Sequence, residues 1–302
     1  MSKITVTILG TTAAVPTRTR AHAAIYIDHS SDKEFCCLFD CGEGTQRQIL
    51  FAGLNLMKLD NIFITHWHGD HCLGLPGVVD TMGFENRKRQ LNVFAPESQR
   101  VKKCLGFSYS IGKINVKTHD VQAKGKKITE LFENDRLRIV SIPVKHSRAA
   151  VAYALFEKDK TGIDLGKAMK LGLPEKGEIY RQLKEEGSIA FGSKIITLEE
   201  ISSIEKGKRI VYSGDTEICE NLRKLASNAD LLIQDCTYFE EEGAYKHAAL
   251  PEILKMVKEC KVARVVLTHI SRKYQSVNAL KKLIKKYPNV EIAEDLMELV
   301  VE

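Results

Sequence analysis

The stretch Thr65-His66-Trp67-His68-Gly69-Asp70-His71 follows the apolar run Ile62–Ile64, which has the composition of a buried strand. His66 and His68 can point the same way once the chain leaves the strand. Asp70 and His71 fall on the opening turn of the next helix and face another direction. This geometry suits two adjacent metal ions better than one, and a polar turn without metal is the ordinary alternative. Imidazole with carboxylate favours zinc, with manganese or iron possible where oxygen ligands increase.

One segment offers too few ligands for two metals, so the others must come from elsewhere in the chain. His146 follows the predicted strand 137–143, Asp215 follows the strand 209–212, and His269 follows the strand 264–267. Strand ends are where α/β folds place their sites. Singly, these residues also fit a surface histidine, a helix-capping aspartate and a polar strand end. Together they complete a set of seven candidate ligands: His66, His68, Asp70, His71, His146, Asp215 and His269.

Short apolar runs of strand type alternate with helical patterns, which indicates an α/β chain. We expect strands at 62–65, 91–94, 137–142, 209–212, 230–233 and 264–267, and helices at 44–52, 97–105, 217–226, 249–259 and 276–286. A weak internal repeat is also present. The runs 35–39 and 209–212 each lead into an aspartate, and each half then has a strand ending in Thr-His, at 65–66 and 268–269. The repeat predicts one domain built from two similar halves, although coincidence among short β-branched runs is the alternative.

Residues 157–187 interrupt this alternation with glycines spread among charged residues. Loops of this length inside a compact domain are usually functional or disordered. We interpret the segment as a protruding insertion that carries two short helices, at 164–171 and 178–186.

The composition excludes some classes of protein and leaves others open. With 302 residues and 44% apolar composition, the chain can bury a large core. No apolar run approaches the roughly 18 residues of a membrane span, and the first strand is too short for a signal sequence. The eight cysteines contain no C-x-x-C pair, so we expect buried free thiols in a reducing compartment, the cytoplasm, rather than disulfides or a metal cage. The net charge of +6 is compatible with an anionic partner without proving one.

The order of these ligands, His66-x-His68-x-Asp70-His71, His146, Asp215 and His269, resembles the metallo-β-lactamase superfamily. Within it the chain is most similar to the ribonuclease Z family, the endonucleases that trim the 3′ end of precursor tRNA. The motifs that carry this similarity are Leu9–Pro16, Phe39–Gln48, Gly74-Leu75-Pro76-Gly77, Tyr212–Thr216 and Leu267–Ser271. The resemblance runs from about residue 4 to residue 275. It implies an α/β fold, a four-layer αβ/βα sandwich, formed by 1–302 as one domain of two similar halves.

The resemblance also implies roles for the ligands. His66, His68 and His146 would hold one metal, Asp70, His71 and His269 the other, and Asp215 would bridge them. Asp40 would orient ligand histidines without binding metal. The implied enzyme is a zinc-dependent endoribonuclease with two Zn²⁺ per chain (Mn²⁺ or Fe²⁺ possible). The two ions would lower the pKa of a shared water from about 16 toward 7, and the resulting hydroxide would attack the phosphodiester at the 3′ side of precursor tRNA.

The family assigns departure of the 3′ oxygen to a histidine paired with a glutamate. His247 lies where that histidine is expected, although alanines follow it here in place of small hydroxyl residues, and Asp235 takes the place of the glutamate. Asp70, His247 and Asp235 are therefore the expected catalytic residues. A histidine at a helix start without a catalytic role is the alternative for His247.

The family carries a flexible arm where residues 158–187 lie, and that arm grips the elbow of tRNA from the partner subunit. This implies precursor tRNA as the partner and a homodimer. Residues 158–187 hold seven Lys and Arg against six Asp and Glu, so counterion release on RNA binding would be modest. Two other functions stay open: a superfamily hydrolase acting on a small phosphodiester, sulfate or thioester, and a metal-bearing RNA-binding protein without catalysis.

Overall fold

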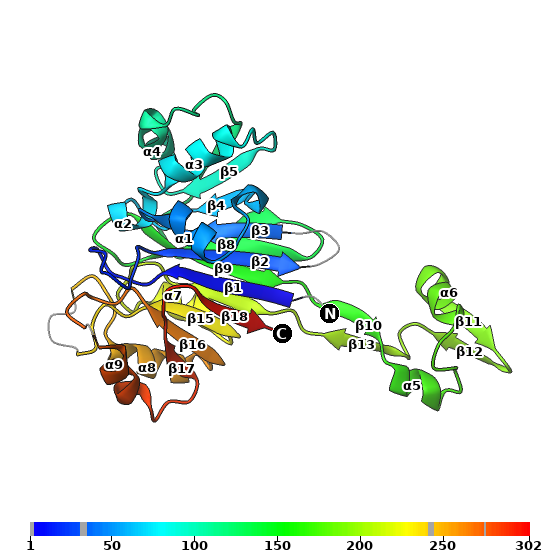
Figure 1. Ribbon diagram of the computed structural model, residues 1–302. Coiled ribbons are helices and arrows are strands. Elements are labelled where there is room, and N and C mark those ends of the chain that lie inside the picture. Colours follow the sequence, from blue (N-terminus) through cyan, green and yellow to red (C-terminus); the bar gives the residue numbers. More distant parts are fainter. Residues whose placement is uncertain (1–2, 31–34, 241–244, 275) are drawn as a thin grey trace. The chain divides into compact units, whose positions relative to one another are not determined.

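Two seven-stranded sheets form the centre of the unit Met1–Phe156 and Lys208–Glu302 in the computed structural model, which describes residues 3–30, 35–240, 245–274 and 276–302 (Figure 1). In order across the first sheet, the strands are β18 (Met297–Val301), β1 (Lys3–Gly10), β2 (Ala24–Ser30), β3 (Phe35–Phe39), β4 (Asn61–Phe63), β5 (Leu91–Ala95) and β6 (Val116–Asp120). In the second they are β17 (Val290–Ile292), β16 (Arg264–Thr268), β15 (Leu231–Asp235), β14 (Arg209–Tyr212), β9 (Ala150–Glu157), β8 (Leu137–Val144) and β7 (Thr129–Glu133).

The space between the sheets is filled by buried side chains from both of them. Val6, Ile27 and Phe63 of the first sheet belong to one apolar cluster with Tyr153 and Ile233 of the second. These residues come from strands whose two faces are both covered, which explains why the strands read as continuous apolar runs rather than as alternating ones. Burial of such side chains contributes about 1.5–3 kcal/mol each to folding.

Helices cover the two outer faces of the sandwich (Figure 1). Against the first sheet lie α1 (Thr45–Phe51), the short helix η1 (Leu56–Lys58), α2 (Gly69–Cys72), α3 (Leu75–Phe84), α4 (Gln99–Cys104) and η2 (Leu105–Phe107). Against the second lie α7 (Glu220–Ala226), α8 (Leu250–Glu259) and α9 (Val277–Ile284). On α8 the buried residues Leu250, Ile253, Met256 and Val257 repeat at helical spacing, so one apolar stripe faces the sheet. The expected four-layer αβ/βα arrangement is confirmed.

The predicted repeat is present in the sheets but differs in detail. Parallel strands β3-β4-β5-β6 in one sheet correspond to β14-β15-β16-β17 in the other. In the first sheet, the strand that pairs in parallel with β3 is β4, which leads to Thr65-His66. In the second sheet, the strand that pairs in parallel with β14 is β15, which ends at Asp235. The two Thr-His sequences therefore follow strands at different positions in their sheets. Strand β18, at the C-terminal end, joins the first sheet by pairing with β1.

Residues Glu157–Gly207 form the second compact unit, here called the inserted unit. It contains β10 (Lys160–Ile163), α5 (Leu165–Lys170), α6 (Ile179–Glu186), β11 (Ser188–Phe191), β12 (Lys194–Thr197) and β13 (Ser202–Glu205). Its core includes Ala168, Leu173, Leu183, Ile189, Ile196 and Ile201. The two expected helices correspond to α5 and α6. The unit continues to Gly207, beyond the expected limit of 187. After α6 the chain forms the β11-β12 hairpin, and β13 then returns to pair with β10.

All eight cysteines are free thiols, and six of them are buried. Burial raises the pKa of Cys36 to about 12, because the thiolate would lose its hydration, and Cys72 behaves in the same way. These thiols therefore pack as small apolar side chains. No helix within the described ranges is long and apolar enough to cross a membrane.

Candidate metal centre

The first group of candidate ligands consists of His66, His68 and His146 with the Oδ2 atom of Asp215. His66 Nε2 lies 3.0 Å from His68 Nδ1, and His146 Nε2 lies 3.1 Å from the same nitrogen. Asp215 Oδ2 lies 3.5 Å from His66 Nε2 and 3.9 Å from His146 Nε2. His66 follows β4, His146 follows β8 and Asp215 follows β14, so both sheets contribute ligands.

A second group surrounds the other carboxylate oxygen of Asp215. His71 Nε2 and His269 Nε2 lie 3.1 and 3.2 Å from Asp215 Oδ1, and 3.3 Å from each other. Asp70 Oδ2 completes the group, 3.3 Å from His269 Nε2. Asp215 thus turns one oxygen toward each group. The seven residues singled out from the sequence all lie in one place.

The spacing of these atoms fits divalent metal ions. Two nitrogens that bind one tetrahedral zinc at about 2.0–2.1 Å lie roughly 3.3–3.4 Å from each other. The nitrogens of each group are 3.0–3.3 Å apart. Buried Asp215 Oδ1 makes no hydrogen bond with the described residues, although His71 Nε2 and His269 Nε2 lie beside it, a costly arrangement unless a cation satisfies the oxygen. The two groups are therefore suited to binding divalent metal.

The electrostatics of the histidines also favour a bound cation. Burial lowers the pKa of His66 far below its usual value, and that of His68 and His146 as well, which favours the neutral imidazole that metal ligation requires. Burial would also lower the pKa of His269, but the Asp215 carboxylate and two other aspartates outweigh it and raise this pKa to about 10. The carboxylates that raise the pKa of His71 and His269 would equally attract a divalent cation to the second group.

Four of the five candidate ligand histidines are held firmly through their other ring nitrogen. Two of them donate to a threonine hydroxyl: His66 Nδ1 to Thr65 Oγ1 at 3.0 Å, and His269 Nδ1 to Thr237 Oγ1 at 2.9 Å. His146 Nδ1 donates to the Lys246 carbonyl at 2.8 Å. Such contacts fix the tautomer and the direction of the ring. Sequence reasoning missed all three acceptors, and no sequence signal could indicate the Lys246 carbonyl, because every residue has one.

Two buried aspartates organise these contacts in the same way. Asp40 Oδ2 accepts from His71 Nδ1 at 2.7 Å, and the Asp40 carboxylate also accepts from Thr65 Oγ1, the hydroxyl that holds His66. Asp235 Oδ1 accepts from Thr237 Oγ1 at 2.7 Å, the hydroxyl that holds His269. Each aspartate therefore reaches one ligand histidine through a threonine. Asp40 occupies the orienting position expected of it, and it does not face either metal group.

Asp235 also holds the other expected catalytic residue. His247 Nδ1 donates to Asp235 Oδ2 at 2.9 Å, and the His247 ring stacks on His269 at 5.3 Å between centroids. The side chain of His247 keeps 18% of its surface exposed, while Asp235 is buried. The pKa of His247 is raised, since the hydrogen bond and charge of Asp235 outweigh the opposing effect of burial. A raised pKa keeps the imidazole protonated to higher pH, as a proton donor requires.

The glycines of the flanking motifs allow the backbone to pack closely beneath the ligands. A Cβ atom added to Gly42 would lie 2.2 Å from the Asp70 carbonyl oxygen, and one added to Gly74 would lie 2.0 Å from the Gly42 carbonyl oxygen. Any larger residue would push α2, which carries Asp70 and His71, away from the site. The N-terminal motif contributes a direct contact, because the Ala14 amide donates to Asp70 Oδ2 at 2.8 Å.

A cavity of 500 Å³ opens onto the second metal group and His247. Its lining includes Val15, Tyr238, Ser271 and Arg272. An adjacent cavity of 780 Å³ shares Ser271 and Arg272 with it and adds Arg18, Arg20 and Lys273. Lys273 is paired with Glu240 and Arg20 is buried, so Arg18 and Arg272 are the cations that this approach offers to an anionic substrate.

Two sheets that present histidine and aspartate ligands at their strand ends define a hydrolase of the metallo-β-lactamase type. Residues 200–270 match the family model described as "Beta-lactamase superfamily domain", and residues 4–163 match the one described as "Anti-Pycsar protein Apyc1". Human tRNase Z, short form, superposes with a TM-score of 0.68 at 23% identity and covers 98% of both chains. A diphosphatase from the PhnP family gives 0.65 at 19% identity, over 100% of this chain and 98% of its own. At these identities the structures show the shared fold.

Relatives that match over nearly the full length of the chain identify one family within this superfamily. Ribonuclease Z of Methanosarcina acetivorans is 35% identical over 98% of this chain and 97% of its own length. Ribonuclease Z of Methanococcus maripaludis is 37% identical over 97% of this chain and 98% of its own length. The chain belongs to the ribonuclease Z family.

Asp40 provides a test of the orienting contacts that does not touch the metal ligands. In Asp40→Asn the amide group keeps its size but turns an N–H toward either His71 or Tyr212, which both donate to Asp40 Oδ2. We expect metal affinity to fall by about 10–100-fold, as is typical when such a partner is lost. Competition with a chelator measures it. Asp120→Asn, whose side-chain oxygen can still accept from the Ser98 amide on the surface, is the matched control. A folded Asp40→Asn variant with normal affinity would contradict this role.

Proposed function

We propose that this protein is a zinc-dependent endoribonuclease that cuts a phosphodiester at the 3′ side of precursor tRNA, with two Zn²⁺ per chain. Its family makes it a hydrolytic endoribonuclease of the metallo-β-lactamase type that acts in tRNA processing. The observation that carries the finer proposal is the division of the ligands into two groups that share Asp215. Cleavage of a 3′-extended tRNA, followed by mapping of the product ends, tests it.

The proposed division of ligands follows the two groups. His66, His68 and His146 would hold one ion and Asp70, His71 and His269 the other, while Asp215 would bind both through its separate oxygens. Bound there, two divalent cations would lower the pKa of a water molecule and stabilise charge on the attacked phosphate. Mn²⁺ or Fe²⁺ would fit the same nitrogen and oxygen ligands.

His247 is proposed to protonate the departing 3′ oxygen. Its Nδ1 is occupied by Asp235, so Nε2 is the ring nitrogen left to face the substrate at the cavity. Asp235 keeps the ring protonated and fixes its direction. The alternative, a histidine without a catalytic role, gives no reason for this buried carboxylate partner. Asp70 would contribute to catalysis as a metal ligand that the Ala14 amide holds in place.

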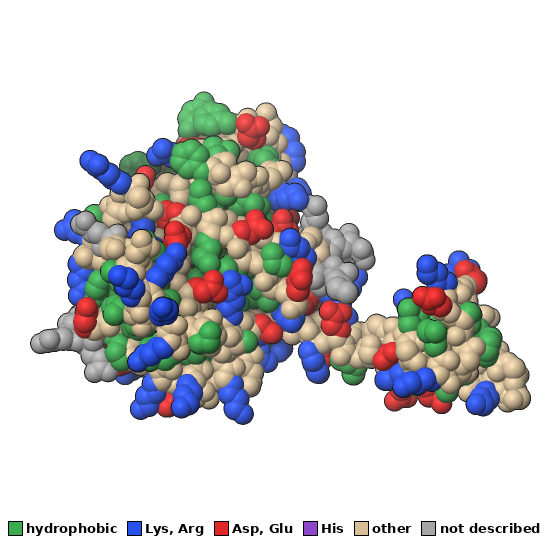
Figure 2. Space-filling view, turned by 60° about the horizontal axis from the view of Figure 1, so that its bottom comes forward, with side chains coloured by type: hydrophobic (Ala, Val, Ile, Leu, Met, Phe, Trp, Pro, Cys, Tyr) green, Lys and Arg blue, Asp and Glu red, His purple; other side chains and the backbone are tan. Residues whose placement is uncertain are grey.

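The two other functions considered from the sequence find less support. A noncatalytic RNA-binding protein would not need seven ligands gathered with a second, buried carboxylate–histidine pair. A hydrolase of a small phosphodiester would not need the adjacent cavity with Arg18, Arg20 and Lys273. The face drawn in Figure 2 does not decide the question, because Lys and Arg are interspersed with Asp and Glu on it.

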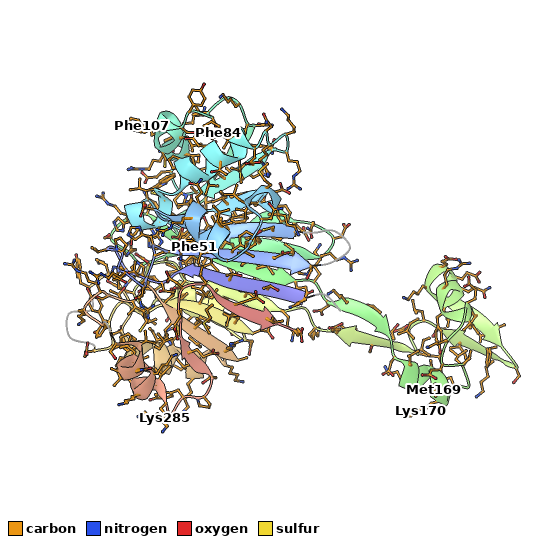
Figure 3. The ribbon with its side chains drawn as sticks, in the orientation of Figure 1. Phe51, Phe84, Phe107, Met169, Lys170 and Lys285 are labelled. Carbon is orange, nitrogen blue, oxygen red and sulfur yellow. The ribbon has the colours of Figure 1, made fainter. Side chains whose placement is uncertain are left out.

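The inserted unit is proposed to contact the body of the tRNA. Residues 157–207 hold nine Lys and Arg and ten Asp and Glu, so charge alone would not attract RNA. Apolar side chains are nevertheless exposed on this unit, among them Met169 at 55%, beside Lys170 (Figure 3), and Ile195 at 73%. This surface therefore supports recognition of the tRNA by its shape rather than by its charge.

The homodimer and the cytoplasmic location stay predictions. Exposed aromatic side chains are present on the larger unit: Phe51 on α1, and Phe84 and Phe107, which Figure 3 shows at the end formed by α3 and α4. Phe84 stacks on exposed Tyr109. Aromatic residues are enriched where subunits meet, which supports a dimer that covers this surface. The eight free cysteines support a reducing compartment.

Metal content tests the two-ion proposal directly. We expect the purified protein to carry close to two equivalents of transition metal, chiefly zinc, and His68→Ala to lose a clear part of it by elemental analysis. His119→Ala, which removes a partly buried histidine on β6, should keep the wild-type content. A metal-free protein that remains fully active would show the mechanism to be wrong.

His247→Ala separates proton donation from metal binding. Cleavage of precursor tRNA should fall by about 10²–10⁴-fold, the usual contribution of a general acid, with both metals retained. Asp235→Asn should lower the cleavage rate less than His247→Ala does, because the His247 ring is still present. It should also weaken metal binding, because Asp235 holds Thr237 and through it His269. Wild-type rates in His247→Ala would remove this residue from the site.

Deletion of the inserted unit separates substrate binding from chemistry. Phe156 and Arg209 pair across β9 and β14, so a short Gly-Ser linker can replace residues 158–207. All seven ligands lie in the other unit, and we expect it to fold and bind metal unchanged. Precursor-tRNA cleavage should be crippled mainly through KM, while hydrolysis of a small chromogenic phosphodiester is spared, since only a large substrate gains from remote contacts.

Two outcomes of this deletion would contradict the proposal. Unchanged tRNA cleavage by the folded, metal-loaded variant would refute a role of the inserted unit in RNA binding. Equal loss on both substrates would show that the unit supports the metal centre instead. Circular dichroism and elemental analysis of the same sample establish folding and metal content.

A further inference from the structure

A third cavity, of 640 Å³, lies on the His146 side of the metal centre. It is lined by the loop that follows β6, by the end of β8 and by the start of α7. Its cationic residues are Lys126, Lys145 and Arg223, and we call this cavity the lysine groove. Nothing in the proposed mechanism uses it.

The positive charge of the lysine groove is largely uncompensated. Lys126 and Lys145 are exposed, and within the described residues neither forms an ion pair. Arg223 is bound to Glu259. Glu220 is the one carboxylate in the lining, and Lys124 and Lys127 add further positive charge beside Lys126. Lysines that are not neutralised by neighbouring carboxylates are available to an anionic ligand.

The loop that carries Lys126 is fastened in place. The Asn221 side-chain amide donates to the Gly125 carbonyl at 3.0 Å and to the Pro143 carbonyl at 2.8 Å. One side chain of α7 therefore ties this loop to the end of β8, which leads to Lys145. A charged loop held by hydrogen bonds loses less entropy on binding than a free one.

The groove is connected to the metal centre through the backbone. Lys145 directly precedes the ligand His146, and consecutive Cα atoms are about 3.8 Å apart. The Lys145 carbonyl accepts from the Glu217 amide at 2.9 Å, two residues after the shared ligand Asp215. One wall of the lysine groove therefore lies one residue along the chain from His146, and it is hydrogen-bonded to the segment that follows Asp215.

We propose that the lysine groove binds a backbone phosphate of the substrate RNA next to the one that is cleaved. This inference rests on the proposed function, and it assigns Lys126 and Lys145 to substrate binding rather than to chemistry. A lysine ammonium binds phosphate as a point charge, without reading the base. The phosphate belongs either to the 3′ trailer or to the tRNA body, which present the same chemistry.

The test compares the full-length, metal-loaded enzyme with the double variant Lys126→Ala/Lys145→Ala. We expect KM for precursor tRNA to rise about tenfold at moderate salt with kcat within about twofold, because these side chains hold the substrate without touching the reacting atoms. The dependence of log(kcat/KM) on log[salt] should become shallower by about 1. Hydrolysis of a small chromogenic phosphodiester should be unchanged.

Three further variants make the result specific. Lys126→Arg/Lys145→Arg keeps the charge and should restore KM. Lys282→Ala/Lys285→Ala removes the same charge from the exposed side of α9, which lines neither this groove nor the metal cavity, and should behave as wild type. Asn221→Ala releases the loop and should raise KM in the same direction as the double alanine variant.

Substrates with trailers of one and of ten nucleotides identify the phosphate. A KM effect confined to the long trailer places it in the trailer, and an equal effect on both places it in the tRNA body. An unchanged KM and salt slope in the double alanine variant would overturn the proposal, as would an equal loss on the small phosphodiester. If wild type fails to cleave precursor tRNA, the proposed function fails instead. Fluorescence anisotropy with a short single-stranded RNA then still compares the groove variants with wild type.

Discussion

A carboxylate buried completely between the two sheets is the constraint on which the site depends. Asp40 leaves β3 with a left-handed backbone, φ 58°, and accepts hydrogen bonds from His71, from Thr65 and from Tyr212 of the opposite sheet. Tyr212 in turn stacks with Phe39 in the core between the sheets. The packing of the sandwich and the direction of a metal ligand are therefore set by the same few atoms, and a shift between the sheets would move the ligand as well.

Asp235, at the end of a strand in the second sheet, orients site residues in the same way as Asp40 does in the first sheet. Each aspartate is buried, each holds one histidine directly, and each reaches a second through a threonine hydroxyl. The difference lies in the histidine held directly. Asp40 holds His71, which faces Asp215, whereas Asp235 holds His247, which stands beside the ligands at the cavity. One structural device thus supports metal binding on one side and, in the proposed mechanism, proton donation on the other.

The concentration of buried charge makes each side chain of the candidate metal centre depend on the others. Three aspartates (Asp70, Asp215 and Asp235) and six histidines converge in a region that is largely removed from water, and Asp215 Oδ1 makes no hydrogen bond with the described residues. Removing one partner from such a set leaves another charge buried and unpaired, which is strongly destabilising. The proposed RNA contacts lie elsewhere, on the cavities around the mouth of the site and on the inserted unit.

The sequence alone determined the chemistry. Seven candidate ligands could be named because imidazole and carboxylate groups at strand ends have few other uses, and most of the strands and helices that the apolar runs predicted lie within one or two residues of their observed bounds. Only the tertiary structure decided which atoms meet. The acceptors Thr65, Thr237 and the Lys246 carbonyl, the neighbour of β14, and the end of the inserted unit at Gly207 all depend on contacts between distant segments. Local sequence records which groups a residue carries, but hydrogen bonds across strands and loops depend on how the two sheets pack.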